Sequence, residues 1–455
     1  MKFCFLTLIL AINILFVLSC KKDPSGNQPP ETEANILSLQ NPLFWKHSTV
    51  PLLFPESELT NNVSSGFNRA KISWYCIDPL FYNTNLGLRP YNISLDDISE
   101  NECRIILQSE LFPGIESPDN KPLQLSVIDL NYYPAEKGPW NFDLLPGAVS
   151  AGIQPDGKLN NPASRWGGIM RAIENPDFKI NYLDFWIMDP FTKNPELNGS
   201  LYINLGDISE DILNDNLLSS EINATGEVIE TAWGKVKPAQ MVYNFPASNP
   251  ELYDTGLDEM LDVDELKYFA NYLDGIQSNC TADFSAKVAQ DPSNDDYHYF
   301  LGSDYDELNY KVCDRYKNYN GQESNSFPAN NDLANTISSR IPETEDLNHN
   351  GILNTENNYH EYQIKIDKED FQIGSNYIVG KYTTIAQLQN GKKTRTDFYH
   401  FRIPLADFTA SFGNPTLSSN PAFIRMFVTG FANPLVLRFI NLELSEEPVD
   451  YSLFQ

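Results

Sequence analysis

The stretch Tyr182-Leu183-Asp184-Phe185-Trp186-Ile187-Met188 decides the fold class. It precedes an Asp189-Pro190-Phe191 turn and a second apolar run at residues 201–205. Short runs of β-branched and aromatic residues bounded by Pro, Gly, Asn or Asp are typical of β-strands. Apart from Asp184, residues 183–188 are apolar on both faces, which predicts a strand that is covered on both sides. We therefore expect strand, turn and strand between residues 182 and 207.

A second stretch near the end of the chain repeats this pattern. Residues 423–429 and 435–444 have strand character, and Gly430-Phe431-Ala432-Asn433-Pro434 separates them. In Leu435-Val436-Leu437-Arg438-Phe439 an apolar face alternates with a face that carries a charge, as in a sheet with one wet side. Our hypothesis is that each stretch supplies the same hairpin of a jelly-roll sandwich, one in each half of the chain.

Further strand signals occur on both sides of a helical middle. They lie at residues 72–77, 104–107, 123–130, 359–366 and 398–403. The sequence predicts a mainly β fold, with one or two jelly-roll-like β-sandwiches and a helical, loop-rich insertion. The expected domains are a β-rich part at 41–208, the insertion at 209–339 and a second β-rich part at 340–455.

Helix signals are concentrated in the insertion. Asp207 with Glu210 forms a capping pattern that predicts a helix opening at Asp211. Asp262 with Glu265 repeats this pattern before an i, i+3, i+4, i+7 apolar stripe, and Gly275 is placed as its stop. Residues 291–331 are rich in Asn, Asp, Tyr and Gly, which predicts loops.

Composition narrows the functional class. The 455 residues include 61 acidic and 32 basic side chains, a net charge of −29, with 41% hydrophobic residues. A nucleic-acid backbone would be repelled by this charge, and the apolar content excludes a disordered tail. Length and apolar content together allow several domains with real cores.

The first residues predict a lipoprotein. One basic residue, Lys2, precedes a mostly apolar run at residues 3–18, and Val17-Leu18-Ser19-Cys20 is similar to a bacterial lipobox. This similarity implies a signal peptide at residues 1–19, cleavage before Cys20, and acylation of Cys20 that anchors the chain to the outer membrane. Residues 20–40 read as a tether. A plain secretory signal is the alternative, and the sequence leaves the membrane face undetermined, periplasmic or cell-surface.

Four cysteines remain after Cys4 leaves with the signal and Cys20 takes lipid. They are Cys76, Cys103, Cys280 and Cys313. An even number in an oxidising envelope predicts two disulfides, and proximity favours Cys76 with Cys103 and Cys280 with Cys313. Four cysteines allow three connectivities, so the pairing stays open at this point. The five histidines are scattered, and no Cys-x-x-Cys pattern marks a zinc site.

Several co-linear motifs resemble the SprA/Sov family, the outer-membrane translocon of the type IX secretion system and gliding machinery of Bacteroidota. The longest are Phe67-Asn68-Arg69-Ala70-Lys71-Ile72-Ser73-Trp74-Tyr75, Arg165-Trp166-Gly167-Gly168-Ile169-Met170-Arg171 and Phe185-Trp186-Ile187-Met188-Asp189-Pro190-Phe191. Others lie at residues 77–82, 110–113, 129–134, 138–141, 204–211, 291–293, 316–321, 345–348, 401–404, 425–427 and 430–431. Family members are several times longer and carry a large membrane barrel. The resemblance therefore implies a stand-alone copy of a non-barrel region, and translocation is not carried over.

One loop resembles the start of a calcium site. Asp346, Asn348 and Asn350 stand at positions one, three and five, and Gly351 stands at position six. The candidate ligands are Asp346, Asn348, Asn350, Ile352 and Glu356, although Glu356 falls at position eleven instead of twelve. The alternative is an Asn-Gly turn leading into the strand near Tyr359.

The remaining chemistry points to binding. No nucleotide loop, catalytic triad spacing or metalloprotease helix occurs, so we expect no enzyme and no cofactor other than Ca²⁺. Trp140 and Trp166 lie beside Pro or Gly, and would contact a partner or a glycan if exposed. We favour burial in the core, because large aromatic side chains are core material by default. We expect an outer-membrane lipoprotein that binds envelope proteins of type IX secretion or gliding, through sheet edges and loop aromatics. A surface glycan-binding lipoprotein is the alternative, and a small pore is a third candidate.

Overall fold

The computed structural model describes residues 35–83, 89–115, 122–221, 227–237, 255–319, 325–326 and 343–451. Contacts group Asn35–Gln455 into one compact unit, apart from Met1–Ala34. The predicted signal peptide and Cys20 thus lie outside the described residues. No helix in the described ranges is long and apolar enough to cross a bilayer.

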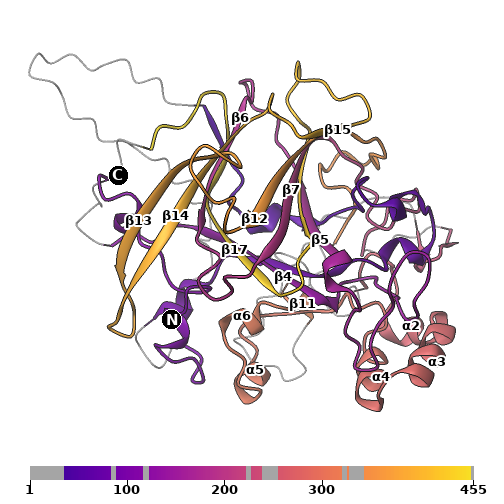
Figure 1. Cartoon of the computed structure of the whole chain (residues 1–455). Coiled ribbons are helices and arrows are strands. Elements are labelled where there is room, and N and C mark those ends of the chain that lie inside the picture. Colours follow the sequence, from indigo (N-terminus) through magenta and orange to yellow (C-terminus); the bar gives the residue numbers. More distant parts are fainter. Residues whose placement is uncertain are drawn as a thin grey trace, which may run out of the picture. The chain divides into compact units, whose positions relative to one another are not determined.

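Two antiparallel sheets form the body of the protein (Figure 1). The first has the order β13 (Ile378–Gln387), β14 (Lys393–Pro404), β6 (Tyr182–Met188), β17 (Leu435–Ser445), β4 (Val127–Lys137) and β3 (Ala70–Tyr75), with β1 (Ile36–Ser38) also on β17. The second has the order β15 (Ala410–Phe412), β12 (Asn358–Asp367), β7 (Asn198–Asp207), β16 (Phe423–Thr429), β5 (Trp166–Ala172) and β2 (Lys46–His47). Side chains from both sheets share one hydrophobic cluster, which includes Ile128, Phe185, Leu201 and Met426. The prediction of a mainly β sandwich is confirmed.

Short elements complete the described chain. Two small ladders join β8 (Ile229–Glu230) to β9 (Lys235–Val236), and β10 (Tyr297–His298) to β11 (Asn325–Ser326). The helices are α1 (Gln108–Leu111), α2 (Asp262–Tyr268), α3 (Ala270–Asn279), α4 (Ala282–Val288), α5 (Ser303–Glu307) and α6 (Val312–Arg315). Figure 1 shows α2, α3 and α4 gathered away from the β13–β14 pair.

The two repeated stretches are arches, not hairpins. Strand β6 lies in the first sheet and β7 in the second, and the same is true of β17 and β16. The arches pair with each other: Phe439 is opposite Ile187 in the first sheet, and Met426 is opposite Ile203 in the second. The prediction of two hairpins is wrong, because each turn carries the chain across the sandwich instead of returning it to the same sheet.

Glycines let the two arches approach closely. A Cβ on Gly199 would lie 2.6 Å from the Phe431 ring, and one on Gly430 would lie 3.1 Å from the Gly199 Cα. Gly430 also has φ +90°, a backbone conformation that side chains with a Cβ rarely adopt. The contact between arches therefore depends on the absence of side chains at these two positions.

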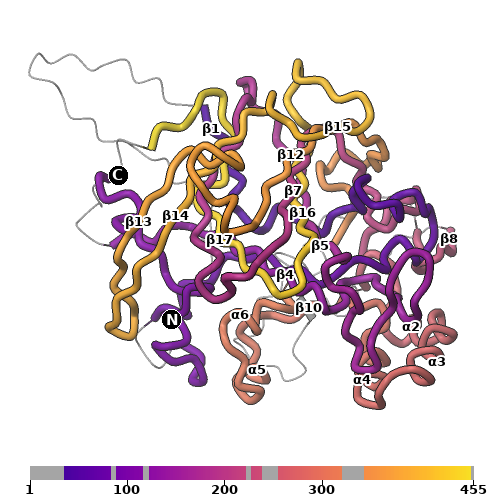
Figure 2. Tube along the Cα trace, viewed as in Figure 1, coloured from indigo at the N-terminus to yellow at the C-terminus, as the bar shows by residue number. Residues whose placement is uncertain are grey.

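Strands from both halves of the sequence alternate in both sheets. In Figure 2 the indigo to magenta strands of the first half run beside the orange and yellow strands near the C-terminus. Strand β6 lies between β14 and β17, and β7 lies between β12 and β16. The β-rich parts at 41–208 and 340–455 therefore share one core. The tether predicted to reach residue 40 stops earlier, because Ile36–Ser38 pairs with β17.

The insertion is helical only in part. Residues 262–288 form α2, α3 and α4, and the chain continues through Gly275, which lies inside α3. The helix predicted at Asp211 is absent. The Glu210 carboxylate instead accepts hydrogen bonds from the distant N–H groups of Leu347 and Asn354, at 2.7 and 3.2 Å. The capping pattern thus anchors a neighbouring loop, not a helix.

A buried ion pair fixes the start of β5. Arg165 and Asp143 have fully buried side chains, and their Nη1 and Oδ2 atoms are 2.8 Å apart. The Arg165 guanidinium also donates to the carbonyl oxygens of Phe67, Gly152 and Asn160 at 2.7 to 3.1 Å. This single side chain ties four segments together.

We expect Arg165→Met to lower the free energy of unfolding by about 3–5 kcal/mol, because it leaves the Asp143 carboxylate buried without its cation. The measurement is equilibrium urea unfolding followed by tryptophan fluorescence. Lys158→Met is the matched control, since its partner Asp156 is largely exposed, and the midpoint should change little. Equal midpoints for both variants would contradict the role given to Arg165.

Candidate functional site

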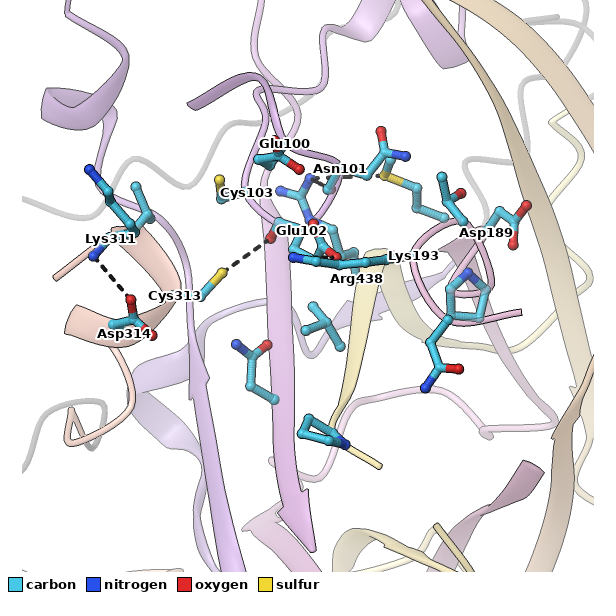
Figure 3. Close-up of a pocket in the computed structure, with 18 of the residues that line it drawn as sticks. Glu100, Asn101, Glu102, Cys103, Asp189, Lys193, Lys311, Cys313, Asp314 and Arg438 are labelled. Carbon is cyan, nitrogen blue, oxygen red and sulfur yellow. Dashed lines mark hydrogen bonds and ion pairs between the residues drawn. The ribbon is translucent and has the colours of Figure 1, made fainter. Parts of the chain in front are cut away.

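A cavity of about 430 Å³ lies where several distant segments meet (Figure 3). Its walls come from the loop around Asp97–Ser99, strands β4 and β17, the turn after β6, and α6. Acidic and basic groups face each other there: Lys311 Nζ lies 3.3 Å from Asp97 Oδ2, and Lys193 Nζ lies 3.3 Å from Glu102 Oε1. The cavity wall therefore carries charged groups of both signs on a lining that is largely apolar.

Arg438 fixes the inner wall of this cavity. Its Nε atom lies 2.7 Å from Asp129 Oδ1, and both side chains are at most 4% exposed. Its Nη1 atom donates to the carbonyl oxygens of Asn101 and Arg104, at 2.8 and 2.9 Å. Burial raises the pKa of Asp129 to about 6, although Arg438 opposes that rise. The pair attaches the 100–104 loop to two strands of the first sheet.

Two cysteines lie at the cavity wall. Cys103 is 4% exposed, and its Sγ atom donates to the Asp97 carbonyl at 3.0 Å. Cys313, on α6, is half-buried, and its Sγ atom lies 3.9 Å from the Glu102 carbonyl oxygen. Both residues line the cavity, and Cys313 packs against the hydrophobic cluster that contains Cys103. The fold thus places together two cysteines that are far apart in sequence.

The pairing predicted from sequence proximity is absent. Cys76, Cys103, Cys280 and Cys313 are all free thiols in the structure. The Cys76 thiol lies near the Gln40 carbonyl and the Ser126 hydroxyl, at 3.9 and 4.0 Å, instead of near Cys103. The two predicted disulfides are not formed in the structure, and their pairing stays a prediction.

Trp140 and Trp166 are core residues. They are 1% and 0% exposed, and the Arg69 guanidinium lies 5.7 and 4.9 Å from the centres of their rings. The Trp140 Nε1 atom donates to Asp295 Oδ2 at 3.0 Å, and Trp166 stacks on Phe54. The favoured prediction, burial of both indoles, is confirmed, and the alternative of contact with a partner or glycan is not supported, because both side chains are almost fully buried.

The loop predicted to bind calcium is closed by its own backbone. The two Asp346 carboxylate oxygens accept from Asn350 N and Gly351 N, at 2.9 and 2.8 Å. Asn350 Oδ1 accepts from Ile352 N at 2.8 Å. The Glu356 side chain, by contrast, accepts from Asn358 Nδ2 at the start of β12. Calcium binding at this loop stays a prediction, with the candidate ligands Asp346, Asn348, Asn350, Ile352 and Glu356.

Sequence reasoning missed a buried carboxylate cluster. Asp258, Glu265 and Asp295 are each under 9% exposed, and each offers an oxygen within 4.8 Å of the others. Ser293 donates to two of them, through Oγ to Asp258 at 2.8 Å and through N to Glu265 at 2.9 Å. The three acids come from a loop, from α2 and from the segment after α4, so their spacing in an acid-rich sequence gave no signal.

Burial and mutual repulsion favour protons in this cluster. Burial raises the pKa of Asp258 to about 8, and burial together with the Asp258 charge raises the pKa of Glu265 to about 10. The pKa of Asp295 is also well above its ordinary value, chiefly through burial. Such oxygen atoms could also hold a hard cation. The hydrogen bonds from Ser293 and Trp140 already occupy part of their bonding capacity.

Strand β13 forms an edge of the first sheet that is open among the described residues. It is ten residues long, and among the described residues it pairs with β14 alone. The other edge strands of the two sheets are shorter: β1 and β15 have three residues, β2 has two and β3 has six. Long open edges are uncommon because they pair readily with other chains.

The hairpin between β13 and β14 determines which backbone N–H and C=O groups of β13 point away from β14. Leu388 N donates to Lys392 O, and hydrogen-bonded pairs alternate along an antiparallel ladder. The N–H and C=O groups of Lys381, Thr383 and Ile385 therefore point away from β14. Their side chains are exposed too, and Ile385 is 69% exposed.

The hairpin formed by β13 and β14 is basic in an acidic protein. Residues 378–396 contain Lys381, Lys392, Lys393 and Arg395 and no acidic residue, whereas the whole chain carries −29. Asp397 neutralises part of this charge, since its carboxylate lies 2.7 Å from Lys381 Nζ. The open edge therefore combines free backbone groups, apolar side chains and positive charge.

Residues 271–451 match the SprA N-terminal family model, described as motility related/secretion protein. This segment is related to SprA. The relationship supports an association of the chain with secretion or motility. No curated protein matches the chain.

The SprA-related segment includes the open edge and half of the sandwich. It contains β12 to β17 and Cys313, whereas β3 to β7 and Cys103 lie before it. Both sheets alternate strands from inside and outside the matched range. Residues 165–171, which lie before the matched range, contribute to the packing between strands: a Cβ on Gly168 would lie 2.8 Å from the Phe427 Cβ of β16.

We expect Glu265→Gln to stabilise the protein at alkaline pH. The pKa values of Asp258 and Glu265 are higher in the folded protein than in the unfolded chain. Their protonated forms therefore contribute their full stabilisation of the folded state below about pH 4. This contribution is lost as the pH rises through the folded pKa values of about 8 and 10. At pH 8 the variant should be more stable by about 1 kcal/mol or more, with a flatter pH profile. Urea unfolding from pH 5 to 9 measures this.

Asp264→Asn is the matched control on the same helix, since Asp264 is exposed and pairs with Lys267. It should leave the slope of stability against pH unchanged. If Glu265→Gln instead lowers the melting temperature, and EDTA lowers that of the wild type alone, the cluster holds a cation in place of protons.

Proposed function

We propose that this protein is a non-catalytic, lipid-anchored outer-membrane component of a secretion or gliding apparatus, which binds an extended acidic segment of a partner protein along β13. The observation that carries the proposal is the open β13 edge within the SprA-related segment. A strand that adds to an open edge gains main-chain hydrogen bonds, and side chains at alternate positions give specificity.

The exposed face of the hairpin selects the chemistry of the partner. Val379 and Ile385 are 46% and 69% exposed and offer apolar contacts at two points along the strand. Arg395 lies opposite Ile385 on β14, and Lys393 lies opposite Gln387. An incoming strand with acidic and apolar residues in alternation would match this face, and binding should weaken as salt rises.

The absence of catalysis belongs to the same proposal. The described residues that line the 430 Å³ cavity include no histidine, and the carboxylates of Asp97 and Glu102 are paired with Lys311 and Lys193. The burial of Trp140 and Trp166 removes the stacking platform on which the glycan-binding alternative depended. Protein binding is therefore the function that the described surface supports.

Site-specific photo-crosslinking tests the partner. A benzoylphenylalanine at Thr383 should form an adduct, in native outer membranes, with a protein of the secretion or motility machinery. The same residue at Leu145, which is 58% exposed and distant in sequence, is the control and should not form it. Equal adducts at both positions, or no adduct at Thr383, would refute binding at β13. An adduct with a second copy of this chain would identify self-association instead.

We expect Thr383→Pro to abolish this adduct, probed from Ile385, while preserving the fold. The N–H of Thr383 points outward, so proline removes a group that the partner needs and β14 does not. Thr384→Pro is the matched control, because the neighbouring N–H bonds to β14. That variant should lower the melting temperature, whereas Thr383→Pro should change it little. Retention of the adduct in a folded Thr383→Pro variant would exclude strand addition.

The membrane anchor is tested separately. In cells fed an alkyne fatty acid, the wild type should carry the label, whereas Cys20→Ala should lose it and appear in the soluble fraction. Cys76→Ala is the control and should stay labelled and membrane-bound. A Cys20→Ala protein that resists alkaline carbonate extraction would contradict a lipid anchor.

A further inference from the structure

The cavity brings two thiols together with unequal exposure. Cys103 is buried, whereas Cys313 is half-buried at the cavity wall (Figure 3). Both belong to one cluster with the rings of Tyr75 and Tyr316. A thiol pair with one accessible and one sheltered member is the arrangement that thiol–disulfide exchange requires.

Two contacts join the segments that carry the cysteines: Lys311 Nζ lies 3.3 Å from Asp97 Oδ2, and Cys313 Sγ lies 3.9 Å from the Glu102 carbonyl oxygen. Further hydrogen bonds hold each segment in place. Lys311, two residues before Cys313, donates through Nζ to the Asn92 carbonyl at 2.8 Å. Arg315, two residues after it, donates through Nη2 to Asn92 Oδ1 at 2.8 Å. On the other side, the Cys103 and Arg104 N–H groups both donate to the Glu100 carbonyl, and Arg438 holds the Arg104 carbonyl. The two sulfur atoms are thus positioned by groups on both sides.

We propose that Cys103 and Cys313 are a redox-active pair that closes to a disulfide at the cavity wall, by exchange with a disulfide-bearing oxidant such as an oxidised dithiol protein or glutathione disulfide. This pair is one that proximity along the chain did not favour. The inference does not depend on partner binding at β13.

The exchange proceeds in two steps, through a mixed disulfide between Cys313 and the oxidant. The Cys313 thiolate attacks one sulfur atom of the oxidant and forms a mixed disulfide with it. The other sulfur atom of the oxidant leaves as a thiolate, which takes up a proton and becomes the first thiol product. The Cys103 thiolate then attacks the Cys313 sulfur, which closes the intramolecular bond and releases the second thiol. The two cysteines lose two electrons and two protons, and the oxidant disulfide becomes two thiols.

The local electrostatics agree with this order of attack. The neighbouring Cys103 thiol has the largest effect on Cys313 and, with the Tyr75 hydroxyl, lowers the pKa of the Cys313 thiol despite burial. The neighbouring Cys313 thiol and then burial raise the pKa of Cys103 well above its ordinary value. Cys313 is also the more exposed of the two, so Cys313 is the attacking thiol and Cys103 the resolving one.

The bond would link the two halves of the sequence. Cys313 lies on α6 within the SprA-related segment, and Cys103 lies before it. Closing a long loop limits the unfolded chain, which stabilises the folded protein. Oxidation should therefore hold α5 and α6 against the 97–104 loop and fix one wall of the cavity.

Peptide mapping of the full-length protein tests the pair. After incubation with glutathione disulfide, alkylation and digestion without reductant should yield a peptide that joins Cys103 to Cys313, and the melting temperature should rise by roughly 2–5 °C. Cys103→Ser should accumulate a glutathione adduct at Cys313, whereas Cys313→Ser should form none at Cys103. Neither variant should show the rise in melting temperature.

Cys76→Ser and Cys280→Ser are the matched controls, and both should keep the bond and the thermal shift. Circular dichroism of each variant confirms that it is folded. Full alkylation of Cys103 and Cys313 after oxidation would overturn the proposal. A disulfide that joins other cysteines, or a glutathione adduct at Cys103 in Cys313→Ser, would also overturn it.

Discussion

Antiparallel pairing between the two arches is the constraint on which the rest of the structure depends. Strand β6 pairs with β17 and β7 pairs with β16, so neither sheet can form from one half of the chain alone. The close approach of Gly199 to Phe431 sets the spacing between the arches. Because these pairings join residues more than 200 positions apart, the loops that connect them are brought together around the cavity and the carboxylate cluster.

Buried charges in this protein act as loop anchors. Arg165 binds Asp143 and three carbonyl groups, Arg438 binds Asp129 and two, and Glu210 accepts three backbone N–H groups. Each buried charge would be costly if left unpaired, so each specifies one loop arrangement. The abundant acidic residues therefore have structural roles inside the protein as well as on its surface. This explains why paired acids in the sequence gave no reliable sign of catalysis.

Sequence patterns predicted the strands well and the sites poorly. The strands β6 and β16 begin and end at the predicted residues, because a strand signal is local: period, β-branching and flanking turn residues. Three features depend on contacts between distant segments: the exposure of Trp140 and Trp166, the neighbours of Cys103, and the cluster of Asp258, Glu265 and Asp295. A flanking Pro or Gly reveals a turn, but not which side of the turn faces the core.

The sequence by itself determined the mainly β fold, the acidic character and the relationship to SprA, because these follow from local pattern and from motif order. Only the tertiary structure decided that both halves share one sandwich, that β13 is the long open edge, and that Cys103 meets Cys313. The physical reason is that strand order and loop contacts are set by packing between segments far apart in the chain, and no local pattern encodes which distant segment a strand will choose.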